Sequence, residues 1–152
     1  MLRSNEPIAL PLHQHTDYDD HEGLDLDQAV GDMGSFVIPI KCEVLLAGLV
    51  VTEVCAGTVT PVVKFDKRPT AGSDASRGDG DVANFALATT AAGKVMYDQA
   101  AMGDILEPGE EVVVELVAKA SGGTPTGHVK PFLLVAYLPE IKTNLPDMVQ
   151  TA

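Results

Sequence analysis

The amino-acid sequence predicts an all-β protein with the architecture of a single jelly-roll-like β-sandwich. Hydrophobic residues make up 45% of the chain, but aromatics only 5% and Trp none, so Val, Leu, Ile and Ala must form the core. The 14 Gly and 10 Pro among 152 residues favour frequent turns. Several runs alternate apolar and polar residues with a period of two, which is typical of strands with one buried face. A chain of this length favours one compact domain.

The strongest pattern lies between residues 110 and 138, where two β-rich segments flank a loop of Gly, Ser, Thr and Pro. The first segment alternates, with Val112, Val114 and Leu116 on one face. The second segment is apolar on both faces, so we expect both faces to be covered. One face can contact the domain core, and the other requires an arm or a neighbouring subunit. That second face consists of Phe132, Leu134, Ala136 and Leu138.

Strands are also predicted upstream of this pattern, at residues 36–40, 43–54, 59–65, 82–87 and 94–97. A short helical turn should follow residue 97. Residues 66–81 are rich in Gly, Asp and Ser and predict an exposed loop. Roughly eight strands joined mostly by short turns favour two packed sheets.

The charge distribution divides the chain into three parts, an acidic arm at 1–34, a β-sandwich at 35–140 and a tail at 141–152. The arm holds eight of the 22 acidic residues but a single basic one. We expect it to lie along another surface. Its acidic residues would face either a cation-rich protein or solvent. Together with the free face of the last strand, its apolar residues are the predicted partner contacts. These contacts are Ile8, Leu10, Leu12, Leu24, Leu26, Phe132, Leu134 and Leu138.

The net charge of −12 argues against nucleic acid or an anionic membrane as the main partner. The N-terminus lacks the apolar core of a signal peptide, and no run approaches the roughly 20 apolar residues of a membrane span. Cys42 and Cys55 lie in apolar, strand-like surroundings and are interpreted as buried, reduced thiols of a protein made in the cytoplasm.

Candidate metal ligands gather in the acidic arm, but their spacing does not match a calcium loop and an extended arm does not preorganise a site. These residues are His13, His15, Asp17, Asp19, Asp20 and His21. Asp74, Asp79 and Asp81 fail the same spacing test. No nucleophile elbow is present, and Val95 stands where a phosphate-binding loop needs Ser or Thr. We therefore expect no catalytic residues, no metal and no cofactor.

A resemblance to a known family emerges from the order of the segments FVIPIKCEV, TVTPVVKFDKRP, TTAAGKV, LEPGEEVVVELVAKA and HVKPFLLVAYLPE. Between residues 34 and 140 the chain resembles small β-sandwich virion proteins of tailed bacteriophages, especially the capsid decoration (cement) class. The matching pieces are turn signals and the final apolar strand.

This resemblance implies a non-enzymatic virion protein on the outer surface of a capsid, made in the host cytoplasm. The implied partners are the major capsid protein and further copies of this chain, most readily as a trimer that uses its terminal arm as a clamp. The family offers no catalytic residue to transfer. The alternative hypothesis is a tail-associated β-sandwich that binds a receptor or carbohydrate. Such sites usually use exposed aromatic residues, so the hypothesis is weakened by the absence of Trp and by the small number of Tyr, which is three.

Overall fold

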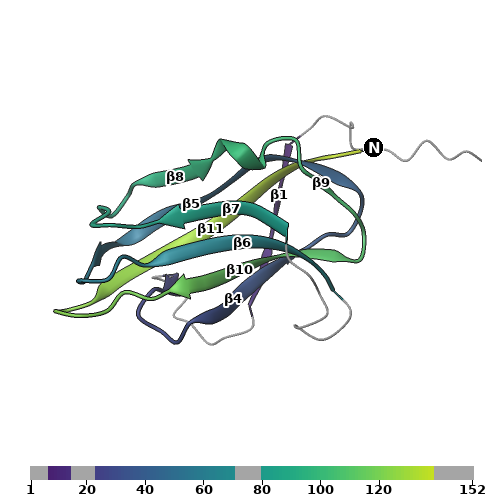
Figure 1. Ribbon diagram of the computed structural model, residues 1–152. Coiled ribbons are helices and arrows are strands. Elements are labelled where there is room, and N and C mark those ends of the chain that lie inside the picture. The colour runs from purple at the N-terminus through teal and green to yellow at the C-terminus, as the bar shows by residue number, and fades with distance from the viewer. Residues whose placement is uncertain (1–6, 15–22, 71–79, 139–152) are drawn as a thin grey trace, which may run out of the picture.

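The computed structural model describes residues 7–14, 23–70 and 80–138, which form two sheets packed face to face (Figure 1). Strands and bridges account for 65% of the described residues, which contain no α-helix, and one sheet is strongly curled. The prediction of an all-β sandwich is therefore confirmed. Neighbouring strands in both sheets run antiparallel.

Sheet A is organised around its two longest strands, which lie side by side. Its strand order is β1 (Pro7–Leu10), β11 (Thr126–Tyr137), β5 (Cys42–Ala56) and β8 (Val95–Asp98). Two short strands extend it, β3 (Leu24–Asp25) on β11 and β9 (Ile105–Leu106) on β5. A 3-10 turn, η2 (Gln99–Ala101), follows β8 where the sequence predicts a helical turn.

Sheet B contains five strands and faces the viewer in Figure 1. Its strand order is β2 (Leu12–Gln14), β4 (Gly31–Val37), β10 (Glu110–Ala118), β6 (Val62–Pro69) and β7 (Gly80–Ala86). The predicted loop at 66–81 is shorter than expected, because β6 continues to residue 69 and β7 begins at residue 80. The charged residues at 66–68 hid the end of β6, whose first part was predicted at 59–65. Residues 71–79 lie outside the described part.

The core between the sheets is aliphatic with one small aromatic group. The ring of Phe65 lies 6.0 Å from that of Phe36 and 5.5 Å from that of Phe85, in tilted and edge-on arrangements. Cys42 and Cys55 are fully buried free thiols, as the sequence predicts. Burial, followed by the charges of Glu107 and Glu110, raises the pKa of Cys42 to about 11, so this thiol stays protonated at neutral pH.

One continuous segment closes one side of the sandwich. Strand β1 pairs with β11, and after Pro11 the chain crosses to sheet B, where β2 pairs with β4. Proline has no N–H to donate to a ladder, which suits the position between two sheets. On the opposite side β7 and β8 approach each other, and the backbone N–H of Asn84 donates to Asp98 Oδ2 at 3.3 Å.

The described residues of the predicted arm belong to both sheets. Residues 7–14 form β1 and β2, and residues 23–34 include β3 and the start of β4. The expected boundary between residues 34 and 35 falls inside β4. These strands are two to seven residues long, which is too short to give a period that the sequence reveals. The predicted tail at 141–152 lies outside the described residues.

Gly48 is required where β5, β8 and β11 meet. A Cβ atom added there would lie 2.5 Å from Phe132 Cζ and still closer to the carbonyl oxygen of Met96. Gly34 is a milder case, since an added Cβ would lie 3.1 Å from the carbonyl oxygen of His13.

We predict that Gly48→Ala destabilises the domain by roughly 1–3 kcal/mol or more, because backbone on one side and a ring on the other leave no room for a methyl group. Urea denaturation monitored by circular dichroism measures the change. Gly34→Ala is the graded control and should cost less. Equal stabilities for wild type and Gly48→Ala would show that the strands separate easily at this point.

Candidate functional site

The outer face of sheet A, which points away from the core, is largely apolar, although register also places Lys130 beside Val50 and Glu43 beside Ile105 on it. Cross-strand register places Leu134 beside Leu46, and in the next row Gly48 lies between Phe132 and Tyr97. Val50 pairs with Val95 one row further along. Residues directly opposite each other in antiparallel strands share a face. We call this surface the outer apolar face, formed by Leu46, Gly48, Val50, Val95, Tyr97, Ile105, Phe132 and Leu134.

Several of these side chains are strongly exposed, which is unusual for large apolar groups in a row. Val95 is 52% exposed and Tyr97 is 55% exposed, both on the short strand β8. Phe132 is half-buried because its ring lies over Gly48. A contiguous apolar patch is more informative than scattered exposed residues, since it indicates an interaction surface.

The predicted partner contacts on the last strand divide into two groups. Phe132 and Leu134 lie half-buried on the outer apolar face, where the sequence placed them. Ala136, on the same face, is 6% exposed and pairs with Pro7 of β1. Leu138 follows the end of β11, half-buried, and its N–H donates to the carbonyl oxygen of Lys41 at 2.9 Å.

The predicted contacts in the arm pack instead against the chain's own core. Leu10, Leu24 and Leu26 are 6%, 1% and 0% exposed. Ile8 is half-buried opposite Val135, and the partly buried Leu12 packs against the core cluster. The surface that these residues contact is the edge of the sandwich itself.

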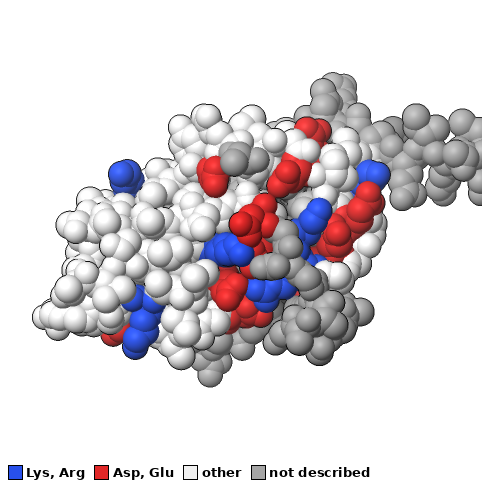
Figure 2. All heavy atoms as spheres, viewed as in Figure 1, with Lys and Arg blue, Asp and Glu red and all other residues white. Residues whose placement is uncertain are grey.

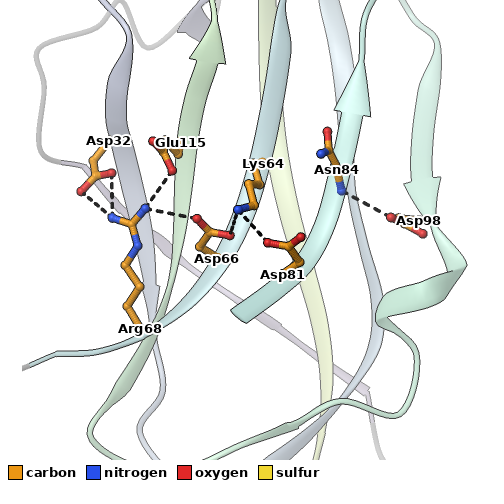
Figure 3. A network of polar contacts seen from close by, with 8 residues as sticks. All are labelled: Asp32, Lys64, Asp66, Arg68, Asp81, Asn84, Asp98 and Glu115. Carbon is orange, nitrogen blue, oxygen red and sulfur yellow. Dashed lines mark hydrogen bonds and ion pairs between the residues drawn. The ribbon is translucent and has the colours of Figure 1, made fainter. Parts of the chain in front are cut away.

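The outer face of sheet B has the opposite character and carries an ionic network (Figures 2 and 3). Arg68 lies at its centre, with Nη1 3.1 Å from Asp32 Oδ1. Its Nη2 donates to Glu115 Oε2 at 2.8 Å and to Asp66 Oδ2 at 3.2 Å. The three carboxylates come from β4, β10 and β6, so one guanidinium links three neighbouring strands.

Lys64 extends this network to β7. Its Nζ lies 3.0 Å from Asp66 Oδ1 and 2.6 Å from Asp81 Oδ1. The Asp66 side chain is 1% exposed, so its charge depends on both cations. Two cations, Arg68 and Lys64, therefore contact four carboxylates in Figure 3, those of Asp32, Asp66, Asp81 and Glu115.

The electrostatics of the network follow from this excess of acid. Burial is the main cause that raises the pKa of the Glu115 carboxyl. The positive charge of Arg68 lowers this pKa, and the nearby carboxylates of Asp66 and Asp32 offset part of that lowering. The pKa of exposed Asp81 is lowered, chiefly by its bond to Lys64. Burial opposes the charge on Arg68, but its carboxylate partners outweigh burial and raise the pKa of the guanidinium.

A histidine–carboxylate pair lies at the start of β11. His128 Nδ1 is 2.5 Å from Glu53 Oε2, and the Gly127 N–H donates to the same oxygen at 3.1 Å. The neighbouring hydroxyl, Thr126 Oγ1, donates to the carbonyl oxygen of Val54 at 2.8 Å rather than to the imidazole. The pair therefore fixes the end of β11 on β5 and activates no nucleophile among these groups.

The predicted ligand cluster of the arm is mostly outside the described residues. His13 is exposed in β2, whereas His15, Asp17, Asp19, Asp20 and His21 are not described, and neither are Asp74 and Asp79. Within residues 7–14, 23–70 and 80–138, no three His, Cys, Asp or Glu side chains are arranged to hold a metal ion.

Two crevices lined by described residues open on the surface, and both are small. One, of about 170 Å³, is lined by residues 55–61 and 87–89. The other, of about 190 Å³, lies between Leu12, Leu24 and the backbone around Val129. Both are below the roughly 300 Å³ at which typical ligand pockets begin. The extended feature with the character of a binding surface is the outer apolar face.

Comparison with known proteins found no matching family model, curated protein or solved structure. In the described part of the chain, no helix has the length and apolar character needed to cross a membrane. The assignment of a function therefore depends on the two faces of the sandwich and on the residues themselves.

We predict that Arg68→Gln lowers the free energy of unfolding by roughly 2–4 kcal/mol near pH 7. The variant leaves the partly buried carboxylates of Asp32 and Glu115 without their cation and the buried Asp66 with Lys64 alone. The loss should shrink at about pH 4, since protonation of Glu115, whose pKa is raised chiefly by burial, removes part of the unpaired charge. Chemical denaturation at both pH values measures this difference.

Lys119→Gln is the matched control for Arg68→Gln. Its ammonium group lies 3.9 Å from Asp27, and both side chains are more than 40% exposed. An exposed pair of this kind contributes less than about 1 kcal/mol. If the two variants lose the same stability, the network does not hold the strands of sheet B together.

Proposed function

We propose that this protein is a non-enzymatic structural protein that docks onto another protein surface through its outer apolar face. The observation that carries the proposal is the contrast between the two faces of the sandwich. Sheet A presents large apolar side chains that no described residue covers, such as Val95 and Tyr97. Sheet B presents charged groups satisfied by one another. A protein lying on a surface requires this arrangement.

The energetics suit repeated attachment better than a single tight complex. Burial of apolar area contributes roughly 25 cal/mol per Å², and much of this is lost to the entropy of association. A face of moderate size therefore binds modestly when alone. Many copies on a repetitive shell act together, because the assembly fixes their positions and raises their effective concentration.

The nature of the shell is proposed from the resemblance of the sequence. We place the protein on the outer surface of a tailed-phage capsid, after synthesis in the host cytoplasm, with the major capsid protein as its partner. Neighbouring copies associate, most readily as trimers. The net charge of −12 supports a protein partner over nucleic acid or an anionic membrane.

The proposal predicts that Val95→Asp and Tyr97→Asp abolish docking while the domain stays folded. Both side chains are more than half exposed, so a carboxylate costs the fold little but must lose its water in a docked face. Val117→Asp is the control, since Val117 is 48% exposed on β10 of sheet B.

The measurement mixes purified protein with phage capsids that lack it, followed by sedimentation and thermal disruption. Wild type and Val117→Asp should co-sediment and raise the disruption temperature, whereas the two sheet A variants should do neither. Failure of the wild type to co-sediment contradicts capsid attachment. Equal binding by all variants contradicts docking through sheet A.

A second candidate function is supported by one feature of the same face. Tyr97 and Phe132 lie in one row on either side of Gly48, and aromatic side chains on a sheet face can stack on sugar rings. A receptor- or carbohydrate-binding tail module would use them in this way. Specific capture of a glycan by the wild type, lost in Tyr97→Ala, would favour this function over capsid attachment.

A further inference from the structure

The segment that closes one side of the sandwich is attached to each sheet along one edge. We call residues 7–14 the N-terminal strap. Its first half pairs with β11, from Pro7 opposite Ala136 to Leu10 opposite Leu133. Its second half pairs with β4, from Leu12 opposite Phe36 onward. The strap is thus the edge strand of both sheets on this side. We call the surface beneath it, between the edges of β11 and β4, the seam.

The strap contributes little to the core compared with the strands that it covers. Among its described side chains, Leu10 is buried and Leu12 is partly buried, whereas Ala9 and His13 are exposed. A crevice of about 190 Å³ lies beside Leu12, where the strap passes Leu24 and Pro131. Packing at this end is incomplete, so the strap is the strand that can leave at the lowest cost.

The seam beneath the strap is specific for an extended chain. It offers the edges of β11 and β4 for backbone hydrogen bonds and an apolar floor for two leucines. Gly34 keeps the floor low, since an added Cβ would lie 3.2 Å from the Leu12 side chain. A partner must therefore present a short strand with apolar residues at the positions of Leu10 and Leu12, separated by a residue that crosses between the sheets.

We infer that the seam of one copy receives the strap of a second copy, so that neighbouring molecules exchange their N-terminal strands. The contacts are the same in either arrangement, so local concentration decides between them. Residues 15–22 connect the strap to the body, and a chain of this length spans up to roughly 30 Å. The inference deepens the proposed function, because it relies on copies being held close together on a shell.

Cross-linking of the full-length protein tests the exchange. His13 and Ser35 lie opposite each other in the register of β2 and β4, on the sheet that does not dock. One preparation carries His13→Cys and a second, differently tagged preparation carries Ser35→Cys. They are mixed at high concentration, refolded together and oxidised. We expect a disulfide-linked heterodimer on a non-reducing gel.

Two controls set the background of this experiment. Val117→Cys replaces Ser35→Cys in a parallel mixture, since Val117 is exposed on sheet B but does not pair with the strap. The double variant His13→Cys/Ser35→Cys, oxidised in dilute solution, should close within one chain and then fail to exchange. A heterodimer in excess of the Val117→Cys mixture supports the inference.

A second measurement avoids the buried Ser35 position. A fluorescent peptide of residues 1–14 is added to the full-length protein, and its anisotropy should rise, whereas a Leu10→Asp peptide should give no rise. Either signal supports exchange, and the absence of both overturns it. Because Val95→Asp blocks docking but leaves the seam intact, failure of the capsid proposal and failure of strand exchange are distinguishable.

Discussion

The pairing of β5 with β11 is the interaction on which the rest of the molecule depends. Eleven residue pairs join the two strands, from Thr126 opposite Ala56 to Tyr137 opposite Cys42. Every other strand of sheet A attaches to one of them, with β1 and β3 on β11, and β8 and β9 on β5. The register shifts at three places along the pair. Bulges of this kind bend a strand and increase its twist, which accounts for a curled sheet.

This central pair also determines where a function can be located. Its inner side chains, including Leu49 and Leu133, are fully buried against sheet B. Several of its outer side chains are also apolar, among them Val50, Phe132 and Leu134, and they are only half-buried. The same two strands therefore supply both the core and the proposed docking face. The outer face of sheet B differs, since Arg68 forms ion pairs with carboxylates from three strands. The proposed docking would therefore depend on the strands that also hold the fold together.

The sequence predicted the features that long strands carry. Residues 110–120 carry an apolar residue at every second position from Val112 onward, and residues 128–138 are largely apolar on both faces. These patterns located β10, β11 and the outer side of Phe132 and Leu134. Other parts of the face could not be predicted, because Val95 and Tyr97 join it only through long-range pairing with β5. Residues 7–14 were assigned to an arm rather than to strands, because strands of three and four residues have no measurable period. The alternation of Lys64, Asp66 and Arg68 was a signal for the ionic network.

Strap and docking face meet along one line of the molecule. Ala9 lies opposite Leu134, so β1 forms the border of the outer apolar face as well as the cover of the seam. If a neighbouring copy supplies this strand, its chain becomes part of the surface that docks. Attachment to a shell and association between copies would then stabilise each other, because a docked neighbour both presents a strap and gains a completed face. The coupling would come from the shared strand, because β1 would belong both to the contact between copies and to the border of the outer apolar face.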